Sequence, residues 1–93
     1  MNREEAKSLL EGQLLPYRSL GYERLLRLLK KQDVFEVVGA SGTVYQLEIQ
    51  AAWDGRKGGD LRVMASIDDR GWRAFVPLTS DFIIRPDGTF ASE

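Results

Sequence analysis

Residues 43–53 read Thr43-Val44-Tyr45-Gln46-Leu47-Glu48-Ile49-Gln50-Ala51-Ala52-Trp53, and their alternation decides the fold. From Tyr45 onward every second side chain is apolar, and the positions between Tyr45 and Ala51 carry Gln, Glu and Gln. A strand places successive side chains on opposite faces of its sheet. A period of two therefore predicts a strand with one buried and one wet face, as in an antiparallel sheet.

Other segments of the chain repeat this pattern, with turn residues between them. We expect four strands, over residues 34–40, 43–54, 61–68 and 72–78. Ser41-Gly42 and Asp69-Arg70-Gly71 are typical of tight turns, and residues 55–60 form a glycine-rich loop. Residues 82–84 are expected to add a short fifth strand or to pack as a capping segment.

The region before the strands has the period of amphipathic helices. Apolar residues spaced by three and four predict a helix over residues 3–15 and a second over residues 19–31. Asn2 and Ser19 are the expected N-caps, and Pro16 is expected to end the first helix. Short connections favour sequential antiparallel pairing. The predicted fold is a single α+β domain over residues 1–93, with two N-terminal helices packed on one face of a four-stranded antiparallel meander sheet.

The composition excludes several classes of chemistry. The 93 residues include no Cys and no His. The chain alone therefore cannot form a disulfide, a thiolate nucleophile, a Ser-His catalytic pair or a zinc site built from these ligands. We predict that it is not an enzyme and that it holds no metal ion and no cofactor.

Charge and hydropathy set further limits. The net charge is −1, with seven Lys or Arg and four Glu in residues 1–32 against six Lys or Arg and ten Asp or Glu in residues 33–93. This segregation falls short of the dense basic surface of a typical nucleic-acid-binding protein. The N-terminus lacks the apolar core of a signal peptide, and no apolar run is long enough to cross a bilayer. The expectation is a cytoplasmic protein without a membrane partner.

The polar face of the predicted sheet is the best candidate for a functional surface. Two large apolar side chains and two cations should cluster there from neighbouring strands: Arg62, Met64, Arg73 and Phe75. Arginine and aromatic residues dominate protein interfaces, and exposed apolar side chains can mark a partner site. These four residues are the predicted partner-binding residues, for a protein partner or a homodimer. The competing interpretation is a solvated face with incidental ion pairs.

Three other features carry weaker functional signals. Arg56 and Lys57 lie in the loop at residues 55–60 and could bind an anion, although the loop matches no phosphate-binding motif. Four Asp residues stand at strand ends, where Asp is common for its turn geometry. Trp53 and Trp72 are expected to close the ends of the core.

No motif in the chain specifies a reaction, so the predicted function is a small non-catalytic protein-interaction or regulatory module. One alternative is nucleic-acid binding through the basic helical end and the loop at residues 55–60. Another alternative is a small-ligand or enzymatic site built from carboxylates and Arg.

Overall fold

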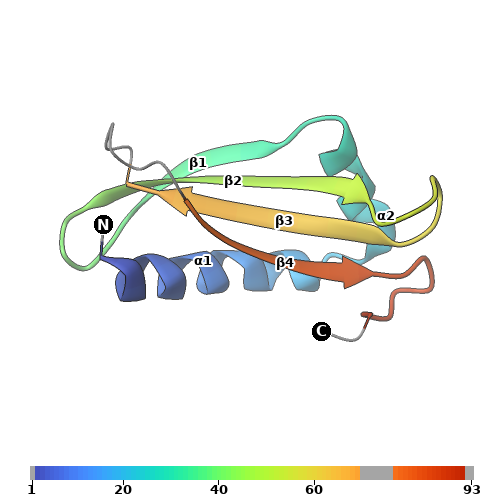
Figure 1. The fold of residues 1–93 in the computed structure, drawn as a ribbon, viewed down its shortest axis with the longest axis horizontal. Coiled ribbons are helices and arrows are strands. Elements are labelled where there is room, and N and C mark those ends of the chain that lie inside the picture. The colour runs from blue at the N-terminus through green and yellow to red at the C-terminus, as the bar shows by residue number, and fades with distance from the viewer. Residues whose placement is uncertain (1, 70–76, 92–93) are drawn as a thin grey trace.

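The computed structural model describes residues 2–69 and 77–91 and contains one long helix, a short helical segment and a four-stranded sheet (Figure 1). Along the chain the elements are α1 (Arg3–Arg18), α2 (Tyr22–Leu25), the 3-10 helix η1 (Leu26–Leu29), β1 (Asp33–Val38), β2 (Val44–Trp53), β3 (Leu61–Asp68) and β4 (Leu78–Ile84). All neighbouring strands pair antiparallel, in the order β1-β2-β3-β4. The predicted α+β class with a meander sheet is confirmed.

Helix α1 begins as its sequence predicts and ends later. The Asn2 side chain accepts a hydrogen bond from the Glu5 backbone N–H at 3.1 Å, which satisfies one of the free donors of the first turn. The prediction that Pro16 ends the helix is wrong, because α1 continues through it to Arg18. Proline costs a helix hydrogen bond and crowds the preceding turn. Contacts of the last turn offset this cost, since the Tyr17 hydroxyl donates to a β1 carboxylate at 2.6 Å and the Arg18 guanidinium lies over a β4 aromatic ring.

The second helix is much shorter than the predicted range of residues 19–31. Ser19 caps the end of α1 instead of the start of a new helix, and its backbone N–H bonds to the Pro16 carbonyl at 3.2 Å. Gly21 then turns the chain with a φ of 86°, which a side chain would disfavour. The following leucine-rich stretch tightens into η1, where residues three apart stack on one side. This spacing buries Leu25 and Leu28 together.

Three of the predicted strands lie within two residues of β1, β2 and β3 at each end. The prediction of residues 34–40 runs past β1, because the Gly39 N–H bonds to the Thr43 carbonyl at 2.8 Å and starts the turn. Gly42 completes this turn with a φ of 89°.

The fourth strand differs from the prediction. Residues 72–76 of the predicted strand 72–78 lie outside the described residues, and the strand that pairs with β3 is β4. Its register runs from Leu61 opposite Ile84 to Ile67 opposite Leu78. Residues 82–84, expected as a short extra strand or cap, are therefore the end of the fourth strand itself. Inward alternation continues through β4 and buries Phe82 and Ile84, which explains why this segment forms the pairing strand.

The core fills the space between the inner face of the sheet and the helices. Its fully buried side chains are Ala6, Leu10, Leu14, Tyr22, Leu25, Leu28, Tyr45, Leu47, Ile49, Leu61, Val63, Ala65, Ile67, Phe82 and Ile84. Leu47 and Ile49, on the apolar side of the alternation in residues 43–53, are buried with helix leucines, whereas Val76 of the predicted fourth strand lies outside the described residues. Trp53 packs partly buried against this core, as expected, and Trp72 also lies outside the described residues.

The helical layer covers the sheet unevenly. Helix α1 packs mainly against β3 and β4, and η1 packs against β2. Accordingly β3 alternates between fully buried and half-buried residues, whereas β1 alternates between half-buried and exposed residues. The inner face of β1 is the least covered part of the sheet.

Candidate functional site

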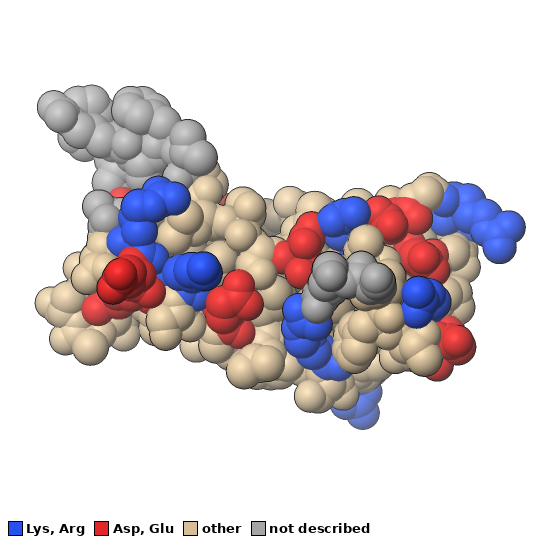
Figure 2. Space-filling view, turned by 60° about the horizontal axis from the view of Figure 1, so that its bottom comes forward, with Lys and Arg blue, Asp and Glu red and all other residues tan. Residues whose placement is uncertain are grey.

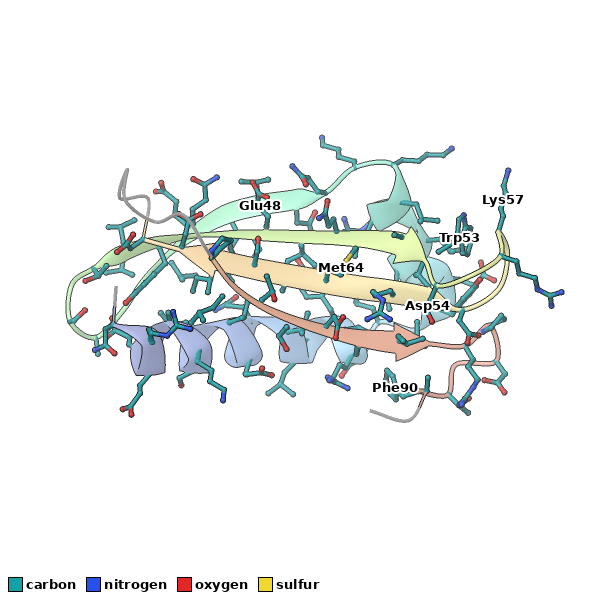
Figure 3. The ribbon with its side chains drawn as sticks, in the orientation of Figure 1. Glu48, Trp53, Asp54, Lys57, Met64 and Phe90 are labelled. Atoms are coloured by element: carbon teal, nitrogen blue, oxygen red, sulfur yellow. The ribbon has the colours of Figure 1, made fainter. Side chains whose placement is uncertain are left out.

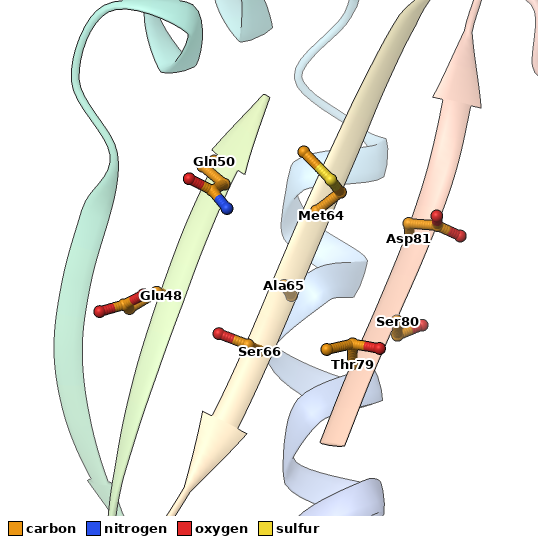
Figure 4. A pocket seen from close by; sticks show the side chains of 8 residues that line it. All are labelled: Glu48, Gln50, Met64, Ala65, Ser66, Thr79, Ser80 and Asp81. Carbon is orange, nitrogen blue, oxygen red and sulfur yellow. The ribbon is translucent and has the colours of Figure 1, made fainter. Parts of the chain in front are cut away.

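The outer face of the sheet is the side without a helical layer. Its central side chains come from neighbouring positions of three strands, with Gln50 opposite Met64 and Met64 opposite Asp81. A hollow of about 290 Å³ lies here, lined by Glu48, Gln50, Met64, Ala65, Ser66, Thr79, Ser80 and Asp81 (Figure 4). Small side chains such as Ser66 leave the space, and Met64 forms its main apolar wall. Figure 3 shows Met64 at the middle of the sheet.

The predicted partner-binding residues are only in part described. Arg62 and Met64 point to the outer face from β3, as predicted, whereas Arg73 and Phe75 lie outside the described residues. The hollow instead brings β4 residues beside Met64, among them Asp81. The sequence signal that could have located them is the alternation of residues 78–84.

Arg62 is held in place by carboxylates from two different segments. Its Nη2 lies 2.9 Å from Oδ1 of Asp54, and its Nη1 donates to Oδ2 of Asp81. These hydrogen bonds, first the one that Arg62 donates to Asp81 and then those that it donates to Asp54, raise the pKa of the Arg62 guanidinium. Arg62 is thus held in one position at the rim of the outer face, where it shares its single positive charge between two carboxylates. The sequence placed Arg62 on this face, but it did not identify its partners.

Exposed valines extend the outer face toward β1, a feature that the sequence analysis did not single out. Val34 is 49% exposed and Val38 is 66% exposed, and both alternate with Glu36 on the outer side of β1. Val44 of β2 lies directly opposite Val38 and is also exposed. The outer face therefore combines a polar centre with an apolar margin along β1.

A polar cluster fixes the helical end of β1. The Tyr17 hydroxyl donates to Oδ2 of Asp33 at 2.6 Å, and the Arg27 guanidinium makes two bonds of 2.9 Å to the same carboxylate. Burial, and then the bond to Asp33, raise the pKa of Tyr17 to about 12. Arg27 holds the pKa of Asp33 below its usual value. Phenol and carboxylate thus keep their ordinary charge states at neutral pH and act as a structural clasp.

A second carboxylate cluster joins α1 to the turn between β1 and β2. Glu5 accepts hydrogen bonds of 2.7 Å from both the Ser41 and the Tyr45 hydroxyls, and a bond of 3.0 Å from the Ser41 N–H. The bonds from Ser41, and then from Tyr45, lower the pKa of Glu5. A carboxylate stabilised in its ionised form is a weak general base. This cluster therefore suits anchoring better than activation of Ser41 as a nucleophile.

The loop at residues 55–60 connects β2 to β3 as a hairpin, with Arg56 and Lys57 exposed (Figure 3). The Tyr22 hydroxyl bonds to the Gly59 carbonyl at 2.7 Å and ties this loop to α2. The structure thereby brings the predicted anion-binding residues to the same end of the sheet as the cations of residues 24–31. That end also carries a hollow of about 390 Å³, lined by Leu28, Leu29, Lys30, Lys31, Gln32, Gln50 and Ala51.

The remaining carboxylates do not converge. Within residues 2–69 and 77–91, no three Asp or Glu side chains are grouped so that they could share a metal ion. Figure 2 shows acidic and basic side chains interleaved over the visible side, instead of one continuous charged surface. Among the described helices, none combines the length and apolar character that a membrane crossing requires.

Comparison with known proteins gives no relative from which a role could be carried over. The chain matches no protein-family model, and no match is found among curated proteins or among solved structures. The geometry of its own surfaces is therefore the basis for the functional proposals.

Proposed function

We propose that this chain is a small non-catalytic protein-interaction module that binds its partner on the outer face of the sheet. The observation that carries the proposal is the hollow around Met64, which lies on a sheet face that no described element covers. Its apolar margin at Val34 and Val38 adds exposed surface of the kind that partners bury. The paired strands below hold this surface rigid, and little reorganisation would accompany binding.

The chemistry of the face favours a protein over a small substrate. The carboxylates beside the hollow are either charge-balanced, as Asp81 is by Arg62, or lie on a surface open to water, as Glu48 does. Neither arrangement supplies a desolvated acid or base. A shallow surface with an apolar wall and a fixed polar rim resembles the centre and rim of protein interfaces.

Site-specific photo-crosslinking in the native cell extract tests this function. Two variants of the chain each carry one benzophenone side chain, the first in place of Met64 and the second in place of Leu15. Leu15 is a matched control, because it is 62% exposed on α1, away from the outer face. We expect one defined crosslinked protein from position 64 and none from position 15. The same products from both positions, or none from position 64, would contradict the proposal.

A second candidate function is binding of a polyanion at the basic end of the molecule. The bond from Tyr22 to Gly59 favours it, because it brings Arg56 and Lys57 toward the cations Arg24, Lys30 and Lys31. Titration of labelled single-stranded RNA at low and moderate salt tests this function. Binding that weakens steeply with salt and is lost in Arg56→Glu with Lys57→Glu would favour it. Absence of binding at low salt would remove it.

A further inference from the structure

The free edge of β1 is open along its length in the described residues. Strand order places β1 at one side of the sheet, with β2 as its partner. The Gly39 N–H points toward β2, where it bonds to the Thr43 carbonyl. Because the direction of backbone hydrogen bonding alternates along a strand, Val34 and Val38 turn their N–H and C=O groups away from β2. These groups form a template for another strand.

β1 lacks several of the features that usually protect an edge strand, although it carries two charged residues, Asp33 and Glu36. The six residues Asp33–Val38 contain no proline and no lysine, and their register with β2 runs without a bulge. Four of the six are apolar. An edge without proline, lysine or a bulge leaves its backbone N–H and C=O groups accessible to a strand of another chain.

A preformed hollow lies beside the inner side of this edge. It measures about 310 Å³ and is lined by Gln13, Pro16, Tyr17, Leu20, Arg27 and Phe35. It exists because α1 packs over β3 and β4 and leaves Phe35 half-buried. The hydrogen bonds of Tyr17 and Arg27 to Asp33 hold two of its walls. A strand added to β1 would direct alternate side chains toward this hollow.

The charged residues before β1 indicate which residues would be favourable at the neighbouring end of a strand that pairs with β1. Lys30 and Lys31 precede β1 by one intervening residue and line the neighbouring hollow, and neither makes an ion pair within the described residues. An acidic flank would complement them. An antiparallel second copy of β1 would bring its turn at residues 39–42 to this place, where the nearby carboxylate of Glu5 is already held by hydrogen bonds from Ser41 and Tyr45.

We propose that an extended segment of a partner protein adds to β1 as a fifth strand, with apolar residues at alternate positions and acidic residues beside Lys30 and Lys31. Backbone hydrogen bonds to Val34 and Val38 give affinity, and the hollow beside Phe35 selects side chains, as in other cases of strand addition. This inference rests on the proposed function as a protein-interaction module, and it names a contact surface separate from Met64.

Selection of random linear peptides displayed on phage, against the whole immobilised chain, tests the proposal. Enriched peptides should alternate apolar residues and carry acidic residues at one end. A synthetic peptide of the enriched sequence should slow hydrogen exchange of the Val34 and Val38 amides. Failure to enrich any peptide, or peptides that protect only other strands, would overturn the proposal.

Two substitutions at one position separate backbone pairing from side-chain contact. Val34→Pro removes an N–H that points away from β2, so the sheet keeps its hydrogen bonds. Val34→Ala keeps the N–H and is the matched control. We expect the proline variant to bind the peptide about tenfold more weakly than the alanine variant, the loss of about one hydrogen bond. Equal affinity of the two variants, with unchanged circular dichroism, would overturn strand addition.

Two further measurements decide between this inference and its alternatives. Met64→Glu should leave peptide affinity unchanged; if it abolishes binding while Val34→Pro does not, the edge proposal is wrong and the proposed function stands. Sedimentation analysis reports self-association. A dimer that dissociates in the Val34→Pro variant would show that a second copy of the chain occupies the β1 edge, and it would overturn the proposal of a partner segment. Crosslinking at Met64 tests the proposed function independently of all these outcomes.

Discussion

The two edges of the sheet are strands of similar length that differ in how they are covered. The six-residue β1 has no fully buried side chain, whereas the seven-residue β4 buries Phe82 and Ile84. The chain after β4 also turns back, so that Ala91 N–H bonds to the Ile83 carbonyl at 2.9 Å and Phe90 pairs with Ile84. Figure 1 shows this return beside β4. The β4 edge is thus packed and partly paired, whereas no other described segment pairs with the β1 edge.

This difference indicates that the burial of a sheet edge depends on whether the helical layer covers it. A single α1 helix is too narrow to cover four strands, since a helix is about 10 Å across and strands lie about 4.8 Å apart. Because α1 lies over β3 and β4 and η1 lies over β2, these three strands carry the fully buried side chains and β1 carries none. The packed edge at β4 therefore contributes to stability, and the opposite edge at β1 is the one at which we propose that a partner binds.

The largest expected effect comes from truncating a packed aromatic on each edge. Phe82→Ala on β4 should lower the free energy of unfolding by about 3–5 kcal/mol, as for buried phenylalanines. Phe35→Ala on β1 should lower it by about 1–2 kcal/mol, because its side chain is half-exposed and loses less burial. Urea denaturation measures both values. Equal losses would show that the two edges are packed alike.

Next in size is the contribution of the C-terminal return. Phe90→Ala should reduce the free energy of unfolding by about 1 kcal/mol, the usual size of an aromatic pair with an added cation–π contact. The Phe82 and Phe90 rings lie 5.7 Å apart edge to face, and the Arg18 guanidinium lies 5.7 Å from the Phe90 ring. Phe90→Leu is the control that keeps apolar contact. If Phe90→Leu lowers the free energy of unfolding as much as Phe90→Ala does, the effect comes from the contacts of the aromatic ring. If neither variant is less stable than the wild type, the C-terminal return does not stabilise the fold.

The clasp on β1 should have an effect that depends on pH. Asp33→Asn should cost about 1 kcal/mol at neutral pH, because the ion pair with Arg27 is more than half exposed on the arginine side. The pKa of Asp33 is lowered by folding, so its contribution is present above the ordinary value of 3.8 and is lost as the pH falls through the folded-state pKa. Stability of the wild type and the variant, measured across this range, should converge at low pH. A constant difference would contradict the assignment.

The smallest expected effect is at the turn between β1 and β2. Glu5→Gln should speed hydrogen exchange at Gly39 and Ser41, because the ionised carboxylate accepts three hydrogen bonds there. Glu4→Gln is the control, since Glu4 is exposed in the same turn of α1. The lowered pKa of Glu5 implies that the same opening appears in the wild type as acid protonates it. Identical exchange in both variants would show that Glu5 does not anchor the turn.

Much of the sheet could be predicted because its signal is local. The alternation of residues 43–53 and 61–68 identified β2 and β3 and their buried faces. The fourth strand was harder, because alternation continues on both sides of Pro77 and pairing with β3 selected residues 78–84. The prediction of the second helix was wrong for a related reason. Four closely spaced leucines fit the period of an α-helix and that of a 3-10 helix, and packing on β2 favoured the 3-10 helix.

The candidate surface was predicted only in outline. Placing Arg62 and Met64 on one face required only strand period, but finding Asp54 and Asp81 around Arg62 required the register of three strands. Val34 and Val38 looked like ordinary strand residues in the sequence. Their exposure depends on which face of β1 turns toward the helices, and the register of β1 with β2 decides this.

The sequence by itself determined the α+β class, the period of β2 and β3 and the absence of imidazole and thiol chemistry, because these depend on residue type and local spacing. Only the tertiary structure decided where α1 lies, which edge is covered and which carboxylate meets which cation. Those outcomes depend on contacts between segments far apart in the chain, such as Glu5 with Ser41 and Tyr17 with Asp33. Such contacts are selected by packing of the whole core, and no local pattern encodes them.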